Sequence, residues 1–267
     1  MKKKKIKNVF YAFEDPDTRT FKKAKKILNK KKIISKLIKC KNYKSFYDSY
    51  FYNKKFNLPF VSAKIAISKD FYSINRRSKW ITNKQSKKAV HLLRSKNDCI
   101  FSTSKSINID NSLLNCRLNG LDNFKPDLFI IDLNLKLKKK LLINNMLKKR
   151  KTFLITSEKN KNKINFFKKK GYKVIYIKSL VSKNDFRKMF QIVFNLGYSR
   201  VFFETGLTFL NTLLNFKLLN YLYVFQSNTM LNKNGLNNST LKYLKKIKFN
   251  KRIKVNLNND SLYRKEF

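Results

Sequence analysis

Short apolar runs alternate with amphipathic, lysine-rich stretches along most of this chain. The runs are rich in β-branched and aromatic residues, which favour strands over helices. They predict eight strands, at residues 8–13, 60–67, 98–103, 128–132, 152–156, 173–177, 200–204 and 221–226. Between them, apolar residues recur at the spacing of one helix face. That spacing predicts six helices, at residues 21–31, 84–94, 138–149, 161–170, 183–196 and 207–216.

The order of these elements predicts an α/β fold. Strands separated by single helices form βαβ units, which build a largely parallel sheet with helices on both faces. The apolar run at 252–257 would add an antiparallel edge strand and make the sheet mixed. Asn83 stands where a helix N-cap is expected, and Gly171 and Gly197 stand where C-terminal caps are expected.

The first 57 residues differ from the rest of the chain. They contain one predicted strand, a very basic helix and an aromatic run at 46–56, shortly before Pro59. The remaining residues are numerous enough to bury a core of their own. We therefore expect a short N-terminal appendage over residues 1–57 and a main domain over residues 58–267.

The net charge of +48 points first to a nucleic-acid partner, because Lys and Arg that neutralise phosphates bind without sequence preference. However, the lysines are spread over the whole chain, and no aromatic stacking motif accompanies them. The chain is also rich in Asn, Ile, Phe and Tyr, whose codons are A/T-rich, so a low-GC genome explains the bias. A basic nucleic-acid-binding protein stays as the weaker alternative.

The residues that this sequence lacks exclude several kinds of site. A single histidine, His91, and three cysteines without CxxC spacing, Cys40, Cys99 and Cys116, cannot supply a usual zinc ligand set. Five glycines form neither a GxGxxG fingerprint nor a P-loop. No apolar run reaches the ~20 residues of a membrane span, and the one near the start is too short for a signal peptide. We therefore expect a cytoplasmic protein without a metal site.

The first candidate site follows from the scarcity of arginine. Only ten of the 63 Lys and Arg residues are Arg, and only Arg offers a planar fork for bidentate contact with phosphate or carboxylate. Arg94 and Arg117 lie near the single tryptophan, Trp80, with Asp110 between them. This grouping favours a phosphate-handling site. Taken singly, Trp80 could be a core residue, Arg94 could balance a helix dipole, and Asp110 could pair with Arg117.

The second candidate is the turn that follows the predicted strand at 200–204. This strand ends in Glu204, and Thr205 and Gly206 lead directly into a helix. In a parallel sheet such a turn lies at the carboxyl edge, where ligands usually bind. The first N–H groups of the helix and its dipole would favour a phosphate. Glu204 could equally be a helix-capping acid.

Several motifs follow one another along the chain: the strand and turn at 59–70, Ser-Lys-Trp-Ile-Thr at 78–82, Leu-Leu-Arg at 92–94, the segments 104–110 and 113–117, and Glu-Thr-Gly-Leu-Thr at 204–208. In this order they resemble the reductase domain of the bacterial bifunctional riboflavin-biosynthesis deaminase–reductase family. Four positions depart from the family pattern: Phe71 replaces a glycine, Asn111-Ser112 replace Asp-Pro, and Leu207 replaces a proline. Residues 8–17 resemble the end of the family's deaminase domain, but the zinc motifs of that domain are not in this sequence.

The resemblance implies a dihydrofolate-reductase-like fold that binds NADPH. The implied reaction reduces the ribosyl group of 5-amino-6-(5-phosphoribosylamino)uracil to a ribityl chain, with hydride from the nicotinamide reaching C1′ of the opened sugar. The resemblance also suggests a homodimer. Without the zinc motifs, two further readings stay open: a partner for a deaminase on a separate chain, and a non-catalytic remnant.

The family's functional residues map onto this chain position by position. Substrate contacts are implied at Ser78, Arg94, Leu114, Arg117 and Glu204. NADPH contacts are implied at Ala66, Trp80, Ser106, Asp110, Leu133, Gly206, Leu207, Thr208, Phe209, Leu210, Asn211 and Thr212. The sequence shows no strongly placed acid–base pair, which suits a reaction that depends on positioning.

Overall fold

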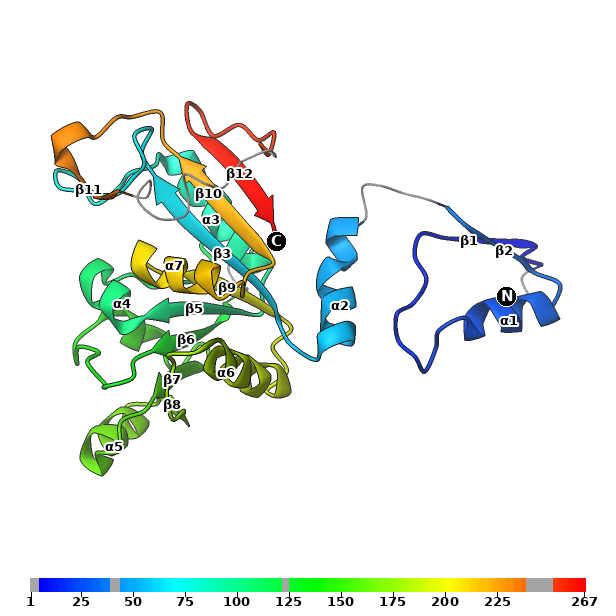
Figure 1. The fold of residues 1–267 in the computed structure, drawn as a ribbon, viewed down its shortest axis with the longest axis horizontal. Helices are drawn as coiled ribbons and strands as arrows, with labels where there is room; N and C mark the ends of the chain where they lie inside the picture. Colours follow the sequence, from blue (N-terminus) through cyan, green and yellow to red (C-terminus); the bar gives the residue numbers. More distant parts are fainter. Residues whose placement is uncertain (1–4, 39–43, 122–124, 239–251) are drawn as a thin grey trace. The chain divides into compact units, whose positions relative to one another are not determined.

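The computed structural model describes residues 5–38, 44–121, 125–238 and 252–267 (Figure 1). The chain divides into two compact units, Met1–Pro59 and Phe60–Phe267. The larger unit is built on an eight-stranded sheet in the order β12-β10-β3-β9-β5-β6-β7-β8. Neighbouring strands run parallel except for β12, which pairs antiparallel with β10. The expected α/β class with a mixed, largely parallel sheet is therefore confirmed.

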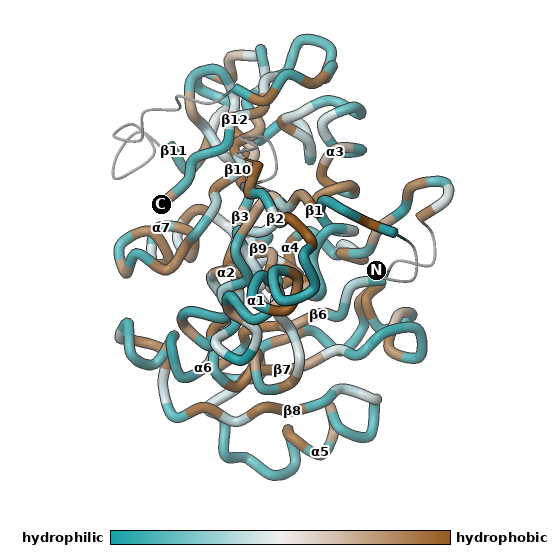
Figure 2. Tube along the Cα trace, turned by 90° about the vertical axis from the view of Figure 1, so that its right-hand side faces the viewer, coloured by the Kyte–Doolittle hydropathy of each residue, from teal (hydrophilic) through white to brown (hydrophobic). Residues whose placement is uncertain are grey.

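The strands of this sheet coincide closely with the apolar runs of the sequence. Their bounds are β3 Phe60–Ile67, β5 Cys99–Thr103, β6 Asp127–Ile131, β7 Thr152–Thr156, β8 Lys173–Tyr176, β9 Arg200–Glu204, β10 Tyr221–Gln226 and β12 Ser261–Glu266. The central strands β5, β6 and β9 are almost wholly buried. Strands buried on two faces keep apolar residues at nearly every position, so they appear as continuous runs. In Figure 2 a hydrophobic stretch accordingly follows β10.

Helices cover both faces of the sheet (Figure 1). They are α3 Lys84–Ser95, α4 Ser104–Asp110, α5 Lys161–Lys169, α6 Lys183–Asn195 and α7 Leu207–Asn215. On one face, Ile107 of α4 shares a buried cluster with Ile130 of β6. On the other face, Phe190 of α6 and Phe209 of α7 contact Phe203 of β9, with ring centroids 6.1 and 6.0 Å apart. The helices thereby leave the carboxyl edge of the sheet to the loops.

The expected helix caps are confirmed. The Asn83 side chain accepts a hydrogen bond from the backbone N–H of Ser86 at 3.0 Å and begins α3. Gly171 and Gly197 follow α5 and α6 with φ angles of 103° and 93°. Glycine adopts this left-handed conformation without the steric cost that a Cβ atom brings.

The helix expected at 138–149 is wrong. Only a short 3₁₀ helix, η3 Leu142–Met146, forms in this segment. Partners outside the expected helix hold the backbone instead, since Asn111 Oδ1 accepts a hydrogen bond from Leu142 N at 2.8 Å. Leu141 and Ile143 nevertheless lie in the buried core. The apolar spacing therefore reported burial correctly and the backbone conformation incorrectly.

The antiparallel edge strand is β12, and not the run at 252–257 that the sequence suggested. Leu262 of β12 packs with Phe225 in a buried cluster, which Leu257 of the expected run also joins, whereas Val255 is exposed. Arg252 forms only an isolated bridge with Tyr263. The run at 252–257 therefore contributes Leu257 to the core without forming the edge strand.

Five further elements were not expected from the sequence. They are α2 Lys44–Phe56, α4, β2 Ile34–Leu37, β4 Tyr72–Asn75 and β11 Gly235–Asn238. Apart from α2, each is at most seven residues long. Such short elements hold too few apolar positions for a period to be recognised. β4 and β11 pair antiparallel in a small sheet of their own.

The Met1–Pro59 unit is small and has little core. Its strand β1 Asn8–Tyr11 pairs parallel with β2, and the connecting helix α1 Lys23–Lys30 buries no residue. The buried carboxylate of Asp17 accepts hydrogen bonds from Arg19 at 2.6 Å and Lys54 at 2.8 Å. Charge pairing thus replaces much of the apolar packing that larger units use.

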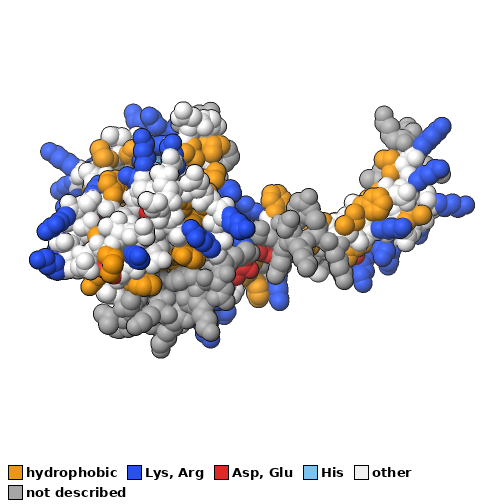
Figure 3. Space-filling view, turned by 90° about the horizontal axis from the view of Figure 1, so that it is seen from above, with side chains coloured by type: hydrophobic (Ala, Val, Ile, Leu, Met, Phe, Trp, Pro, Cys, Tyr) orange, Lys and Arg blue, Asp and Glu red, His pale blue; other side chains and the backbone are white. Residues whose placement is uncertain are grey.

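The surface offers little evidence for a membrane, metal or nucleic-acid role. Among the described residues, no helix is both long and apolar enough to cross a membrane. The same residues contain no group of three or more His, Cys, Asp or Glu that could hold a metal ion, and Cys40 lies outside them. Figure 3 shows Lys and Arg side chains dispersed over the visible face of the larger unit. On that face they form no stripe of the kind that follows a nucleic acid.

Candidate active site

The candidate residues gather at the carboxyl edge of the parallel sheet. Glu204 is the last residue of β9, α4 begins directly after β5, and Asp132 follows β6. Because the strands are parallel, these ends lie on one edge, which is the usual place for a ligand in such folds. Ser104 Oγ donates to Asp132 Oδ1 at 2.9 Å and fixes two of the loops to each other.

Arg94 and Glu204 form a buried bidentate pair at this edge. Arg94 Nε donates to Glu204 Oε1 at 2.5 Å, and Nη2 donates to Oε2 at 2.9 Å. The third guanidinium nitrogen, Nη1, donates to the carbonyl of Asn115 at 2.9 Å. Both charged residues are less than a tenth exposed. Every nitrogen of Arg94 is therefore engaged within the protein, so its fork faces Glu204 and not a substrate phosphate.

Lys64 completes this charged group and was missed in the sequence analysis. Its Nζ lies 3.9 Å from Glu204 Oε2, on the strand that neighbours β9. Burial lowers the pKa of Lys64, and the nearby Glu204 carboxylate opposes that shift. Burial also favours the neutral form of Glu204, but Arg94 outweighs it and holds the pKa of this carboxyl below its ordinary value. The sequence feature that could have identified Lys64 is its place as the single lysine inside a mostly apolar strand.

Arg117 lies beside this group and is exposed. Its Nη1 donates to the side-chain oxygen of Asn115 at 2.7 Å. Asn115 therefore joins the two arginines, since its backbone carbonyl binds Arg94 and its side chain binds Arg117. Of the two predicted phosphate-binding arginines, only Arg117 presents its guanidinium at the surface. Arg117 and Asp110, both of which the structure describes, form no ion pair with each other, so the alternative reading of these two residues as a loop ion pair is wrong.

His91 packs beneath the same loop as a neutral imidazole. Its Nδ1 lies 3.0 Å from the carbonyl oxygen of Asn115. Burial, together with the charges of Arg94 and Arg117, lowers the pKa of His91 to about 4. The imidazole is therefore uncharged at neutral pH, and no Ser or Cys hydroxyl or thiol is bonded to it among the described contacts.

This shift predicts a pH-dependent stability. An unfolded histidine takes up a proton near pH 6.5, whereas folded His91 does so only near 4. Between these values the unfolded state binds more protons, so stability falls as the pH falls, by at most about 3 kcal/mol because His91 is half-buried and solvent screens part of the effect. Urea denaturation at pH 7, 5.5 and 4 measures this loss. His91→Gln should remove most of it, and an unchanged pH profile would contradict the buried neutral imidazole.

Trp80 is exposed, so the interpretation of this residue as core is wrong. Its indole is 54% exposed, with Lys87 Nζ 4.3 Å and Lys79 Nζ 5.5 Å from the ring centroid. Ser78 Oγ accepts a hydrogen bond from Trp80 N at 3.1 Å, and Lys79 Nζ donates to the carbonyl of Asp110 at 2.7 Å. Lys79 thereby links the tryptophan segment to the end of α4.

The Gly206 turn lies next to the start of α4. A Cβ atom placed on Gly206 would come within 3.9 Å of Ser106 Oγ and would meet nothing closer. The φ of Gly206 is −69°, which any residue adopts. The protein itself therefore does not require glycine at this position. Two predicted NADPH residues, Ser106 and Gly206, are brought together at the N-terminal ends of two helices.

The remaining predicted contacts differ in what they can offer a ligand. Thr208 is exposed, and Phe209, Asn211, Thr212, Ala66 and Leu133 are half-buried. Leu114, Leu207 and Leu210 are buried, so they can offer a ligand little beyond their backbone. This burial was not evident from the sequence, where all of these positions followed from resemblance alone.

The Asp70 loop shows how one departure from the family pattern is accommodated. Phe71, at the position where the family has glycine, has a φ of 69°. This left-handed conformation costs a residue with a Cβ about 1–2 kcal/mol. Asp70 holds the turn by accepting hydrogen bonds from Leu231 N and Asn232 N at 3.0 and 2.7 Å. The backbone thus keeps a glycine-like turn without the glycine.

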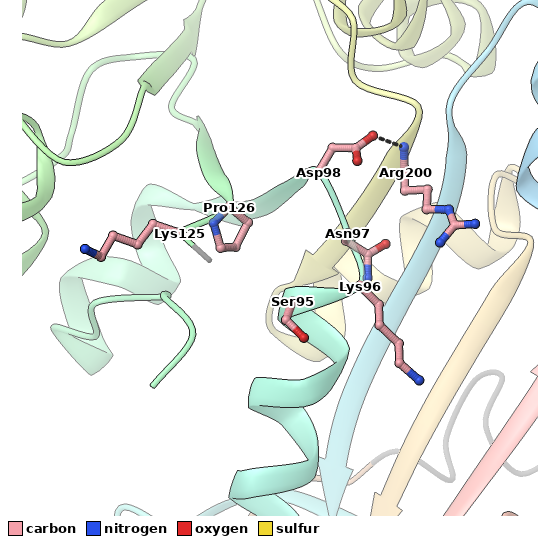
Figure 4. Close-up of a pocket in the computed structure, with 7 residues that line it drawn as sticks. All are labelled: Ser95, Lys96, Asn97, Asp98, Lys125, Pro126 and Arg200. Carbon is pink, nitrogen blue, oxygen red and sulfur yellow. Dashed lines mark hydrogen bonds between the residues drawn. The ribbon is translucent and has the colours of Figure 1, made fainter. Parts of the chain in front are cut away.

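A separate surface cavity lies elsewhere in the larger unit. It has a volume of about 470 Å³ and lies at the opposite edge of the sheet, where β5, β6 and β9 begin (Figure 4). There the Asp98 carboxylate accepts a hydrogen bond from the backbone N–H of Arg200 at 2.8 Å. This carboxylate holds the strand starts together, and none of the predicted site residues lines the cavity.

Comparisons with known proteins agree with the fold. The family model described as RibD C-terminal domain matches residues 59–236. A curated relative, the riboflavin biosynthesis protein RibD of Chlamydia muridarum, is 29% identical over 126 residues, which are 46% of this chain and 34% of that protein. The chain thus matches about a third of the length of this relative.

Two solved structures share the fold. A diaminohydroxyphosphoribosylaminopyrimidine deaminase/5-amino-6-(5-phosphoribosylamino)uracil reductase from Thermotoga maritima aligns with a TM-score of 0.76 and 19% identity, covering 98% of this chain and 71% of that one. The riboflavin biosynthesis reductase Rib7 of Saccharomyces cerevisiae aligns with a TM-score of 0.61 and 17% identity, covering 85% of this chain and 99% of that one.

Proposed function

Since the chain belongs to the RibD C-terminal domain family, we propose that it reduces 5-amino-6-(5-phosphoribosylamino)uracil with NADPH. The observation that carries this proposal is the charged group of Lys64, Glu204, Arg94 and Arg117 beside the Gly206 turn. The group offers donors and an acceptor for a sugar phosphate, and the turn offers backbone donors for a dinucleotide. The two lie at one edge of the sheet, as a transfer between two bound molecules requires.

The Gly206 turn fits the phosphates of NADPH. Its Cβ position is open, Gly206 is exposed, and α7 begins immediately after it. The first N–H groups of this nine-residue helix have no partner one turn earlier in the helix, and the helix dipole favours an anion there. Ser106 at the start of α4 adds a hydroxyl on the same side. The reason for a glycine at this position would then be the ligand and not the fold.

The charged group fits a phosphorylated sugar. Arg117 would hold the phosphate, because its guanidinium is exposed and already oriented by Asn115. Arg94 would act as a positioning residue, because its two bonds to Glu204 fix the carboxylate that accepts hydrogen bonds from the substrate. Lys64 would place its ammonium beside that carboxylate as a further donor.

The chemistry divides between the cofactor and these residues. When bound, NADPH would supply the hydride that C1′ of the opened, imine form of the substrate accepts, and the imine nitrogen would take up a proton from water. The protein aligns C1′ by holding the phosphate at one end and the hydroxyl groups at Glu204. Alignment of this kind can supply several kcal/mol of the barrier reduction.

The direct test is an NADPH-oxidation assay with the ribosylaminouracil phosphate. We expect a loss of absorbance at the nicotinamide band that depends on the substrate, together with the ribitylamino product. NADH in place of NADPH shows which cofactor is used. Binding of NADPH without turnover would leave only the non-catalytic alternative.

NADPH should quench the fluorescence of Trp80, with a Kd on the order of micromolar. The signal is specific because Trp80 is the single tryptophan and is exposed at the site. Gly206→Val should abolish the quenching, because its branched side chain would fill the space where phosphates approach the backbone. The change itself should be tolerated, since the φ of −69° suits valine.

The melting temperature of Gly206→Val serves as the control in this experiment. It should stay close to that of the unmodified protein, because the nearest atom to the added Cβ is Ser106 Oγ at 3.9 Å, an ordinary van der Waals distance. If millimolar NADPH changed neither the fluorescence nor the melting temperature of the unmodified protein, the reductase proposal would fail.

A second candidate function concerns the Met1–Pro59 unit, which we propose packs against a zinc-binding deaminase domain. Its side chains Phe10, Ile27, Ile34 and Leu37 are between 48% and 57% exposed although they lie on β1, α1 and β2. A two-stranded parallel pair cannot bury both of its faces alone. The match to the Thermotoga deaminase/reductase includes this unit, because it covers 98% of the chain.

Co-expression with such a deaminase domain tests this second candidate. A stable complex should be measurable by mass, and Leu37→Asp should disrupt it without altering NADPH binding. An equivalent change in the other unit, such as Val181→Asp on its exposed surface, is the matched control. Absence of any complex with the full chain would contradict the proposed packing.

A further inference from the structure

Arg150 is a buried arginine that none of the sequence motifs includes. It lies between η3 and β7 and is 6% exposed. Its Nη1 donates to the carbonyl of Leu114 at 2.5 Å and to that of Pro126 at 3.1 Å. Its Nη2 donates to the carbonyl of Leu113 at 2.6 Å. One side chain thus binds two successive carbonyls of the loop that leads to Arg117.

This loop has a backbone that needs support. Asn111 and Leu114 have φ angles of 44° and 48°, in the left-handed region. Such conformations cost a residue with a Cβ of the order of 1–3 kcal/mol each and persist only where surrounding contacts impose them. Arg150 binds the carbonyls of Leu113 and Leu114, and Arg94 binds that of Asn115. Two arginines therefore hold three successive carbonyls.

Simple packing does not account for a cation at this position. Arg150 forms no ion pair with any carboxylate of the described residues, and its Nε has no hydrogen-bond partner among them. Burial lowers the pKa of Arg150 to about 10, so it still carries its charge at neutral pH. An apolar side chain of similar volume would avoid the cost of burying that charge. What arginine adds is a planar set of donors that reaches several carbonyls at once.

We propose that Arg150 is a positioning residue for the substrate phosphate. It fixes the loop at residues 113–117 so that Asn115 meets Arg94 and orients the guanidinium of Arg117. This inference rests on the proposed function, because it assigns the loop to substrate binding. It extends that function by assigning part of the affinity for the phosphate to a buried residue on a different segment of the chain.

Arg150→Lys is the first test, because lysine keeps the charge but cannot reach three carbonyls in one plane. We expect the KM for the ribosylaminouracil phosphate to rise roughly tenfold, as the loss of one hydrogen bond to a charged group suggests. The kcat and the Kd of NADPH should change less than about twofold. Amide hydrogen exchange at residues 113–117 should become faster, while exchange in β6 should not.

Two further variants make the result interpretable. Arg150→Gln keeps an amide donor without the charge, and should raise the KM in the same direction. Arg187→Lys on the exposed surface of α6 is the matched control and should change none of these quantities.

Several outcomes would overturn the proposal. Unchanged KM and unchanged exchange at 113–117 would show that the loop does not depend on Arg150. Faster exchange throughout β6 and β7, or failure of both variants to fold, would assign Arg150 to the stability of the core alone. The proposed function fails separately, if the unmodified protein does not oxidise NADPH with this substrate, and the role of Arg150 in substrate binding then fails with it.

Discussion

Arg94→Met should lower the free energy of unfolding by about 3 kcal/mol, because it leaves the buried carboxylate of Glu204 without its main partner. The nearby Lys64, 3.9 Å from Glu204, keeps the loss at the lower end of the range for broken buried pairs. Urea denaturation at pH 7 measures the change. The NADPH-oxidation rate should fall as well, since Glu204 loses its fixed orientation.

The double variant Arg94→Met/Glu204→Gln separates pairing from packing. Removing the carboxylate together with its partner should recover a large part of the lost stability, because no buried charge is then left unpaired. Activity should not recover. Arg187→Met on the exposed surface of α6 is the control and should change stability by less than about 0.5 kcal/mol. If both Arg94 variants were as stable as the control, the buried pair would not hold the site together.

The same pair should respond to acid. The folded pKa of Glu204 lies below its ordinary value of 4.5. A carboxyl with a depressed folded pKa stabilises the protein above its unfolded pKa, and this contribution is lost as the pH falls through the folded value. The difference in stability between the unmodified protein and Glu204→Gln should therefore shrink in acid.

Arg117→Lys should lower kcat/KM by about 10- to 150-fold while leaving NADPH affinity nearly unchanged. A hydrogen bond to a charged group contributes about 1.5–3 kcal/mol, and lysine keeps the charge but loses the planar fork. The loss should appear in the kinetic constants for the substrate and not in the affinity for NADPH. The reason is that Arg117 is linked to Asn115 and the Arg94–Glu204 pair and not to the Gly206 turn. Steady-state kinetics in which the substrate and NADPH are each varied distinguish an effect on the substrate from an effect on NADPH.

A surface change provides the comparison for this variant. Lys168→Gln removes one charge from α5, far along the sequence from the site, and should alter neither kinetic parameter. Near-normal kcat/KM in Arg117→Lys would remove the assignment of the phosphate to Arg117, even if the protein proves to be a reductase. Equal losses in both variants would instead indicate a general effect of net charge.

The strands were accessible from the sequence because they are buried on both faces. Residues 60–67 and 200–204 are mostly apolar in the sequence and form β3 and β9 at those bounds. The segment 138–149 has its apolar residues at a helix-like spacing and was wrongly expected to be a helix. The Asn111 side chain binds the backbone of this segment, and Arg150 binds the neighbouring loop at Leu114. Such contacts between residues distant in sequence produce no periodic pattern that the sequence could reveal.

The site was accessible in part, for a different reason. Arg94, Arg117 and Glu204 stood out because arginine is scarce here and because an acid ends an apolar strand. Lys64 and Arg150 did not stand out. One is a lysine among a great many, and the other lies in a basic stretch, so composition concealed both. Lys64 differs from the other lysines by its place inside an apolar strand, and Arg150 differs from solvated arginines by its burial.

The sequence by itself determined the α/β class and the family resemblance, and it predicted the candidate site residues at this edge. These follow from local patterns, because burial on two faces and motif spacing are both written along the chain. Only the tertiary structure decided which partners those residues have. It places Arg94 on Glu204, 110 residues away, and so leaves Arg117 as the arginine that faces solvent. Pairing of buried charges depends on which strands become neighbours, and no local pattern encodes that choice.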